Sequence, residues 1–204
     1  MSIPSPESAP PAGRPSASVE LRAVALEQFA SVGFAGTSLQ QIADIAGYSK
    51  SSVLYHFASK EALLEAAIGP AIDRLEELLG DIGSLRSSAA ARQTFIESFI
   101  DFLLQYRLEV HTFINQGQSL AGIAVIDRAN ASVAALADNF ASDLEGAEQK
   151  IRFGVALGGA AYTLVAAMNF TDESDMLPLD EIRGALISVV SELLAPVQYR
   201  PHTR

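Results

Sequence analysis

Apolar residues recur along most of this chain at intervals of three and four positions, which is the spacing of one face of an α-helix. Beyond residue 83, no stretch has the pattern that is typical of a strand. We therefore predict an all-α fold. Two short helices are expected between residues 38 and 47 and over residues 50–56, and longer ones over residues 18–32, 60–79, 86–107, 109–116, 123–144, 147–170 and 179–194.

The two short helices have clear start and stop signals. Thr37 and Ser38 can cap the first helix, and Gln41, three residues after Ser38, completes a capping box. Gly47 is expected to end that helix, because glycine readily adopts the left-handed backbone of a helix exit. Ser49 can cap the second helix. Two short helices joined by a glycine-containing turn are typical of a helix-turn-helix, whose second helix enters the major groove of DNA.

On the second short helix, Val53 is predicted to face the core. The residues that would then project outward can donate hydrogen bonds to phosphates and base edges. They are Lys50, Ser51, Ser52 and Tyr55.

At this point the chain resembles a known family. Residues 21–68 resemble the DNA-binding domain of the TetR family of bacterial transcriptional repressors. The resemblance is carried by Ala25, Leu26, Phe29, Gly33, Phe34, Thr37, Ser38, Ile42, Ala43, Ala46, Gly47, Ser49, Lys50, Tyr55, His56, Phe57, Ser59, Lys60, Glu61, Ala62 and Leu63. It implies a homodimer that grips a palindromic operator, and a C-terminal helical domain whose small-molecule ligand weakens that grip. The candidate DNA contacts are Thr37, Ser38, Gln40, Lys50, Ser51, Ser52, Tyr55, His56 and Lys60.

The chain departs from the family in its polar and basic residues. Leu54 stands where the family usually has a tyrosine that touches the DNA backbone. Residues 14–69 contain four basic and five acidic residues, so few ionic contacts with phosphate are expected. A second function therefore stays open, that of a dimeric small-molecule-binding protein of the same fold with weak or lost DNA binding.

Composition sets the broad class and the domain limits. The chain has 204 residues, of which 49% are hydrophobic, and a net charge of −10, which argues against nonspecific coating of nucleic acid or anionic lipid. It contains no cysteine, and its Pro-, Ser- and Ala-rich beginning lacks a signal segment, so we expect a cytoplasmic protein. The predicted parts are a disordered leader (1–17), the helix-turn-helix domain (18–68), a helical regulatory and dimerisation domain (69–197) and a disordered tail (198–204).

Gly69 and Pro70 interrupt the helix over residues 60–79, either as a kink in one helix or as a break between two.

The helix over residues 147–170 is unusually apolar. A membrane span is one interpretation, but the apolar part is shorter than the roughly 20 residues that a span needs, so no membrane is expected. Gly154 and Gly158 have the spacing that allows a partner helix to approach closely. We expect them to form a dimer interface together with Ile187 and Val190 of the last helix, and packing inside one subunit remains the alternative.

A ligand cavity is expected among the helices of the larger domain, as the family resemblance implies. Aromatic residues at helical spacing are more often core than pocket, and the candidate ligand contacts are Phe99, Phe102, Tyr106, Phe113, Gln116 and Tyr162. The expected ligand is a small apolar molecule with one or two hydrogen-bonding groups.

The chain shows no catalytic motif and no metal-ligand spacing, so we expect no enzyme activity, no catalytic residue, no metal and no cofactor.

Overall fold

The structure is a computed structural model, and it describes residues 16–80, 88–141, 146–170 and 177–195. Within these residues every regular element is helical, which confirms the all-α prediction. The elements are α1 (Ala17–Ser31), α2 (Leu39–Ala46), α3 (Lys50–His56), α4 (Lys60–Gly80), α5 (Ala89–Gln105), α6 (Arg107–Gln116), the 3₁₀ helix η2 (Gly117–Leu120), α7 (Ala124–Ala141), α8 (Ala147–Phe170) and α9 (Leu179–Leu193).

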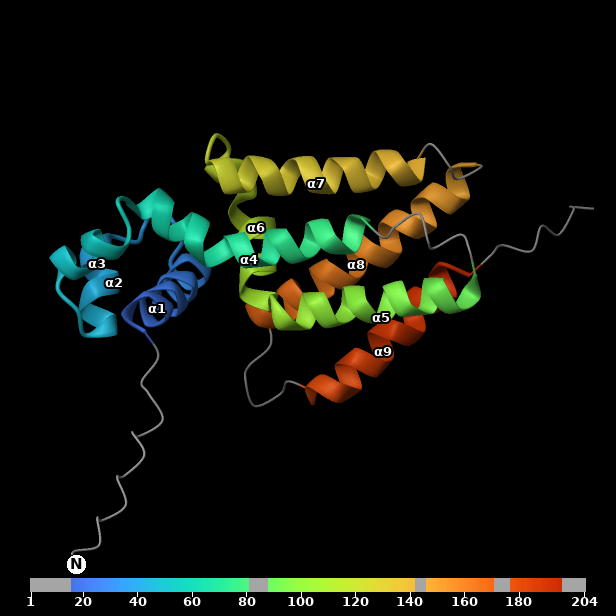
Figure 1. Cartoon of the computed structure of the whole chain (residues 1–204). Coiled ribbons are helices and arrows are strands. Elements are labelled where there is room, and N and C mark those ends of the chain that lie inside the picture. The colour runs from blue at the N-terminus through green and yellow to red at the C-terminus, as the bar shows by residue number, and fades with distance from the viewer. Residues whose placement is uncertain (1–15, 81–87, 142–145, 171–176, 196–204) are drawn as a thin grey trace, which may run out of the picture.

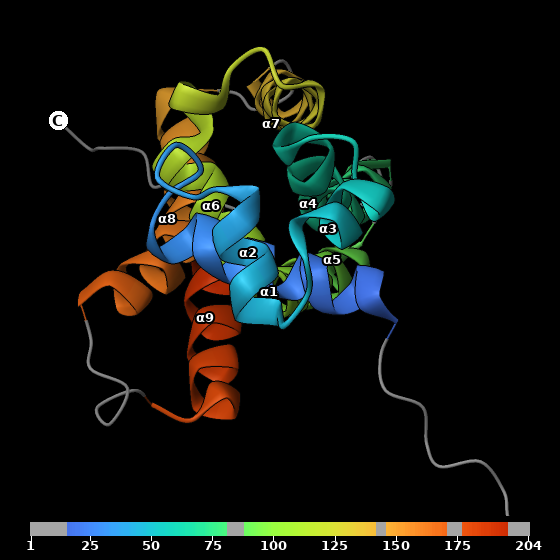
Figure 2. The same ribbon diagram turned by 90° about the vertical axis from the view of Figure 1, so that its left-hand side faces the viewer.

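The helices form a small head and a larger body. Helices α1 to α3 make the head at one end of the molecule, and the second half of α4 forms the body together with α5 to α9, with α9 packed on α5 and α8 (Figure 1). Viewed from the head, α1 and α2 lie in front of the body helices (Figure 2). The predicted tail lies outside the described residues, as does the predicted leader except for residues 16 and 17, and Ala17 already belongs to α1.

Helix α4 joins head to body without interruption. It runs from Lys60 to Gly80 and contains Pro70, so the predicted break between two helices is wrong. Proline in a helix interior removes one backbone hydrogen bond and favours a bend. Figure 1 shows the helix changing direction where it leaves the head.

The buried apolar side chains form two clusters. The head cluster is built around α1, α2, α3 and the first half of α4, but it also includes Val125, Ile126 and Ala129 of α7. The body cluster joins the second half of α4 to α5, α8 and α9, with Phe99 and Leu157 among its buried members. The predicted domain boundary at residue 68 is therefore not a boundary in packing, because the head cluster extends across it into α7.

Helix α8 buries one side and leaves the other exposed. Phe153, Leu157 and Val165 are buried, whereas Ile151 and Val155 are exposed. By length and composition this helix could cross a membrane, and only 28% of its most apolar window is buried within the subunit. An exposed apolar side of this kind is typical of a surface that contacts another protein or a membrane.

Candidate DNA interface and ligand cavity

The start and the end of α2 follow the predicted signals. The Ser38 hydroxyl accepts a hydrogen bond from the Gln41 N–H at 3.2 Å, and the Ser38 N–H donates to Gln41 Oε1 at 2.8 Å. This pair is the predicted capping box. Gly47 ends the helix with a φ of 74°, in the left-handed region that favours glycine. The turn that follows is thus set by local sequence.

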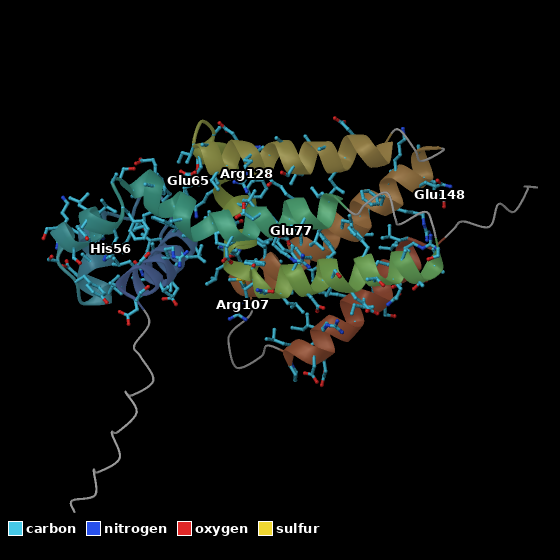
Figure 3. All side chains as sticks on the ribbon, in the orientation of Figure 1. His56, Glu65, Glu77, Arg107, Arg128 and Glu148 are labelled. Atoms are coloured by element: carbon cyan, nitrogen blue, oxygen red, sulfur yellow. The ribbon has the colours of Figure 1, made fainter. Side chains whose placement is uncertain are left out.

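Helix α3 presents a polar face to solvent. The Ser49 hydroxyl caps it by accepting from the Ser52 N–H at 3.1 Å, and Val53 is fully buried in the head cluster. With Val53 fixed inward, Lys50, Ser51 and His56 are exposed. Tyr55 is 85% exposed, and its ring meets that of His56 edge to face with centroids 5.2 Å apart. Figure 3 shows His56 on the head, at the end of the molecule away from Glu148.

Two predicted DNA contacts are used inside the protein instead. Thr37 is 3% exposed, and its hydroxyl donates to the Gly33 carbonyl at 2.8 Å. The Lys60 ammonium donates to the carbonyls of Phe34 at 2.7 Å and Thr37 at 2.8 Å, and lies 4.2 Å from the centre of the Phe34 ring. The Thr37 hydroxyl thus holds the α1–α2 connection against the end of α1, and Lys60 holds it on α4. Both side chains are engaged within the head and not directed at an outer surface.

The other predicted contacts on α2 lie at the surface. The exposed Ser38 is occupied by its capping bonds, and the exposed Gln40 amide donates to Asp44 Oδ1 at 2.7 Å. The exposed carboxyl of Glu61, at the start of α4, has a lowered pKa because it accepts hydrogen bonds from its own backbone and from Ser59. It therefore stays charged at neutral pH and adds a negative charge to the head. Leu54 is 44% exposed, an apolar residue among the polar side chains of α3.

The body contains a cavity of about 260 Å³ between the two clusters. Among the described residues, its lining is apolar with one exception, Glu109. The lining residues are Ile68, Ala71, Ile72 and Leu75 of α4; Phe99, Phe102 and Leu103 of α5; Glu109, Val110, Phe113 and Ile114 of α6; Ala129, Val133 and Leu136 of α7; and Leu157, Gly158 and Ala161 of α8. The volume is slightly below the range of ligand pockets, which is roughly 300–1,000 Å³.

Half of the predicted ligand contacts line this cavity. Phe99, Phe102 and Phe113 do, whereas the other three point elsewhere. Tyr106 lies against the Phe102 ring with centroids 5.4 Å apart, and Tyr162 is on the exposed side of α8.

Gln116, the third of these residues, joins the body to the head. Its Oε1 accepts from the Phe34 N–H at 2.7 Å, and its Nε2 donates to the Phe29 carbonyl at 2.6 Å. Gln116 is the last residue of α6, the helix whose preceding turns contribute Val110, Phe113 and Ile114 to the cavity. One helix thus contacts both the cavity and the head.

Glu109 is the residue that the sequence analysis missed. It lines the cavity and also a second hollow of about 250 Å³ between α1 and α4. Burial raises the pKa of its carboxyl, and a hydrogen bond from its own backbone only partly offsets this effect. The same hollow is lined by Arg22, whose Nε is buried without a hydrogen-bond partner.

The predicted interface residues divide into two groups. Gly154 and Gly158 are exposed on α8, next to Val155. Ile187 is half-buried, and Val190 is 1% exposed, with both packed in the body cluster. Val190 therefore belongs to the core of one subunit and cannot meet a partner directly.

Comparison with known proteins identifies the head. The model of bacterial regulatory proteins of the tetR family matches residues 21–67. The HTH-type transcriptional regulator RutR of Escherichia coli K12 is 51% identical over 49 residues, which are 24% of this chain and 23% of RutR. YerO of Bacillus subtilis, an uncharacterized HTH-type transcriptional regulator, is 35% identical over 78 residues, 36% of this chain and 27% of YerO. The matches thus span about a quarter of each of these relatives.

Solved structures extend the likeness to the body. The ketosteroid transcriptional regulator KstR2 of Mycobacterium tuberculosis is similar over 88% of this chain and 95% of its own, with a TM-score of 0.63 and 17% identity. SCO3833 of Streptomyces coelicolor, a TetR family member, has a TM-score of 0.63 and 19% identity over 88% of this chain and 91% of its own. At such identities the likeness shows the fold alone. From the match of the family model, the head of the chain, residues 21–67, belongs to the tetR family of bacterial regulatory proteins, and the chain shares its overall fold with a solved member of that family.

Proposed function

We propose that this protein is a cytoplasmic transcriptional repressor that binds a palindromic operator as a homodimer and releases it when a small apolar molecule enters the body. The observation that carries this proposal is the combination of two features. Helix α3 presents an exposed polar face in a head whose short helices are capped by their own side chains. The body contains an apolar cavity, and α4 and α6 connect the body to the head.

The surface of α3 supports DNA binding. Lys50 supplies a cation at the start of the helix, and Ser51, Tyr55 and His56 supply exposed donors and acceptors along it. Phosphate contacts position a protein on DNA, and polar contacts with base edges in the major groove select the sequence. The buried Val53 fixes which side of the helix turns outward.

The exposed side of α8 supports a dimer. Ile151, Gly154, Val155, Gly158 and Tyr162 follow one another at helical spacing and are all exposed. The two glycines leave room for another helix to approach, and an isologous contact would place α8 against its copy across a two-fold axis. Such a dimer would place two heads at a fixed distance, which for adjacent half-sites is about 34–36 Å.

The link between cavity and head supports release. A ligand that binds one head spacing better than another draws the population toward that spacing. The contacts that would move with the ligand are those of α6, through the two hydrogen bonds of Gln116, and those of α4, which passes the cavity and continues into the head.

The test is a gel shift with the purified protein on the DNA upstream of its own gene, repeated over a range of salt concentrations. Saturable binding that competitor DNA does not remove is expected. Lys50→Ala should weaken that binding and lower the salt slope by about one, since one phosphate contact is lost. Lys150→Ala is the matched control, because Lys150 is an exposed lysine near the start of α8, the end of the body away from the head (Figure 3 labels the nearby Glu148).

One observation favours a second function, a dimeric ligand-binding protein without DNA binding. Leu54 is an exposed apolar residue on α3, and Lys50 is the one lysine or arginine on that helix. If neither the upstream DNA nor duplexes selected from a random pool bind, the repressor proposal fails. If Lys50→Ala and Tyr55→Ala leave binding unchanged, α3 is not the reading helix.

A further inference from the structure

The cavity has a single polar residue among its described lining residues, and that residue is an acid. Glu109 lies in the first turn of α6 with Val110, Phe113 and Ile114 on the same wall. Phe99 and Phe102 of α5 add aromatic side chains to the lining. A carboxyl group in such surroundings has lost much of its hydration, which is costly unless a partner restores it.

Within the described residues, no ion pair or hydrogen bond joins the Glu109 carboxyl to another side chain, and its hydrogen bond is with its own backbone. Arg107, two residues earlier, is exposed (Figure 3). Arg22 borders the second hollow rather than the cavity. The Glu109 carboxyl therefore borders an apolar space large enough for a ligand and has no cation as partner there.

Resting on the proposed function, we propose that the effector is an amphiphilic amine, with a compact apolar body that fills the cavity and an ammonium group that binds Glu109. An ammonium donates charge-assisted hydrogen bonds to a carboxylate, and these are stronger than neutral ones. Phe99, Phe102 and Phe113 add ring faces that attract a cation. A neutral alcohol would offer the carboxylate a hydrogen bond without a positive charge, and an anionic ligand would be repelled, because no described lining residue is basic.

Three ligands that differ only at one end test this proposal, namely phenylbutylammonium, phenylbutanol and phenylbutanoate. Isothermal titration of the full-length protein measures each dissociation constant directly, without DNA. The ammonium ligand is expected to bind roughly tenfold or more tightly than the alcohol, and the carboxylate most weakly. Glu109→Gln removes the charge at nearly constant size, so the ammonium should lose this advantage, and Glu109→Asp should keep most of it.

Glu148→Gln is the matched control. Glu148 is also an acid in the first turn of a helix, α8, but it is exposed at the far end of the body (Figure 3). Its replacement should leave the order of the three ligands unchanged. Equal binding of the ammonium and the alcohol to the wild-type protein, or an ammonium preference that persists in Glu109→Gln, overturns the proposal. Failure of all three to bind also overturns it, since the cavity then takes no ligand of this kind.

Substitution of Arg22 distinguishes a purely structural role of Glu109 from a role in ligand binding. If the carboxyl serves only to attract that guanidinium across the second hollow, Arg22→Gln and Glu109→Gln should change stability alike, and the ligand order should stay as in the wild type. DNA binding is measured separately by gel shift with and without the ammonium ligand. If the protein binds DNA but does not prefer the ammonium ligand, the amine-effector proposal fails and the repressor proposal stands. If it prefers the ammonium ligand but does not bind DNA, the repressor proposal fails.

Discussion

Replacing Gln116 by alanine would remove the two side-chain hydrogen bonds that tie the end of α6 to the head. One bond is accepted from the Phe34 N–H at 2.7 Å, and the other is donated to the Phe29 carbonyl at 2.6 Å. A hydrogen bond within a protein contributes about 0.5–1.5 kcal/mol net, so we expect Gln116→Ala to lower the free energy of unfolding by about 1–3 kcal/mol. The side chain is partly buried, so water replaces the lost partners only in part.

The same substitution should weaken the effect of an effector on DNA binding. A coupling of about 1–3 kcal/mol corresponds to a change in affinity of roughly 5–150-fold. If these two bonds transmit that coupling, an effector that releases DNA from the wild-type protein should release it much less from Gln116→Ala. Gln116→Glu should fall between the two, because the carboxylate still accepts from Phe34 and no longer donates to Phe29.

Urea denaturation followed by circular dichroism, at one fixed protein concentration, measures the stability change. Gln118→Ala is the control, since Gln118 is an exposed glutamine two residues later in η2. The reasoning is refuted if Gln116→Ala and Gln118→Ala have the same unfolding midpoint and slope. A lower stability with unchanged effector response would refute the coupling role and leave the structural one.

Four further changes are expected to have distinct outcomes. Burial raises the pKa of Glu109 above its ordinary 4.5, so the charged carboxyl costs stability at neutral pH. Glu109→Gln should therefore raise the urea midpoint there, and the gain should fade as the pH falls through the raised pKa and be gone below 4.5. A gain independent of pH would contradict this cause. Arg183 lowers the pKa of Asp101, so Asp101→Asn should lower stability at neutral pH. The variant should match the wild type once the pH is below that depressed pKa and Asp101 is protonated. Equal urea midpoints at every pH would show that the ion pair does not contribute to stability. Val155 is exposed on α8, so Val155→Glu should give a folded monomer in sedimentation equilibrium, whereas Val155→Ala should remain a dimer. A dimeric Val155→Glu would show that the dimer interface lies on another surface. Thr37→Val should lower the free energy of unfolding by about 1 kcal/mol, because the Gly33 carbonyl loses its hydrogen-bond donor. Thr37→Ser keeps the hydroxyl and should retain most of the stability. If the substitution changed DNA binding and not stability, Thr37 would be a DNA contact.

The head was predictable because its signals are local. The capping box of Ser38 and Gln41, the left-handed exit at Gly47 and the inward Val53 all depend on residues within a few positions of one another. Helix ends in the body were predictable for the same reason, since spacing and breakers act within one turn or two. Pro70 shows the limit of such signals, because the packing of α4 on both sides keeps the helix continuous through it.

The residues whose roles the sequence did not predict depend on partners that are distant in sequence. Lys60 has the residue type of a phosphate contact, but the carbonyls that hold it lie 26 and 23 positions earlier. Val190 has the period of an interface helix, yet α5 and α8 already cover it. Glu109 was overlooked because five helices form its cavity, and no pattern within α6 shows that an acid in its first turn faces an apolar space.

The head and the body are not interchangeable modules, because a single hydrophobic core crosses the line between them. Val125 and Ile126 of α7 are buried with Ile68 and the residues of α1. A chimera that joined this head to another body at residue 68 would remove Ile72, Leu120, Val125, Ile126 and Ala129, five of the 17 buried residues of the head cluster. New combinations of operator and effector should therefore arise by substitution within one chain, or by exchanges that carry the buried face of α7 along with the head.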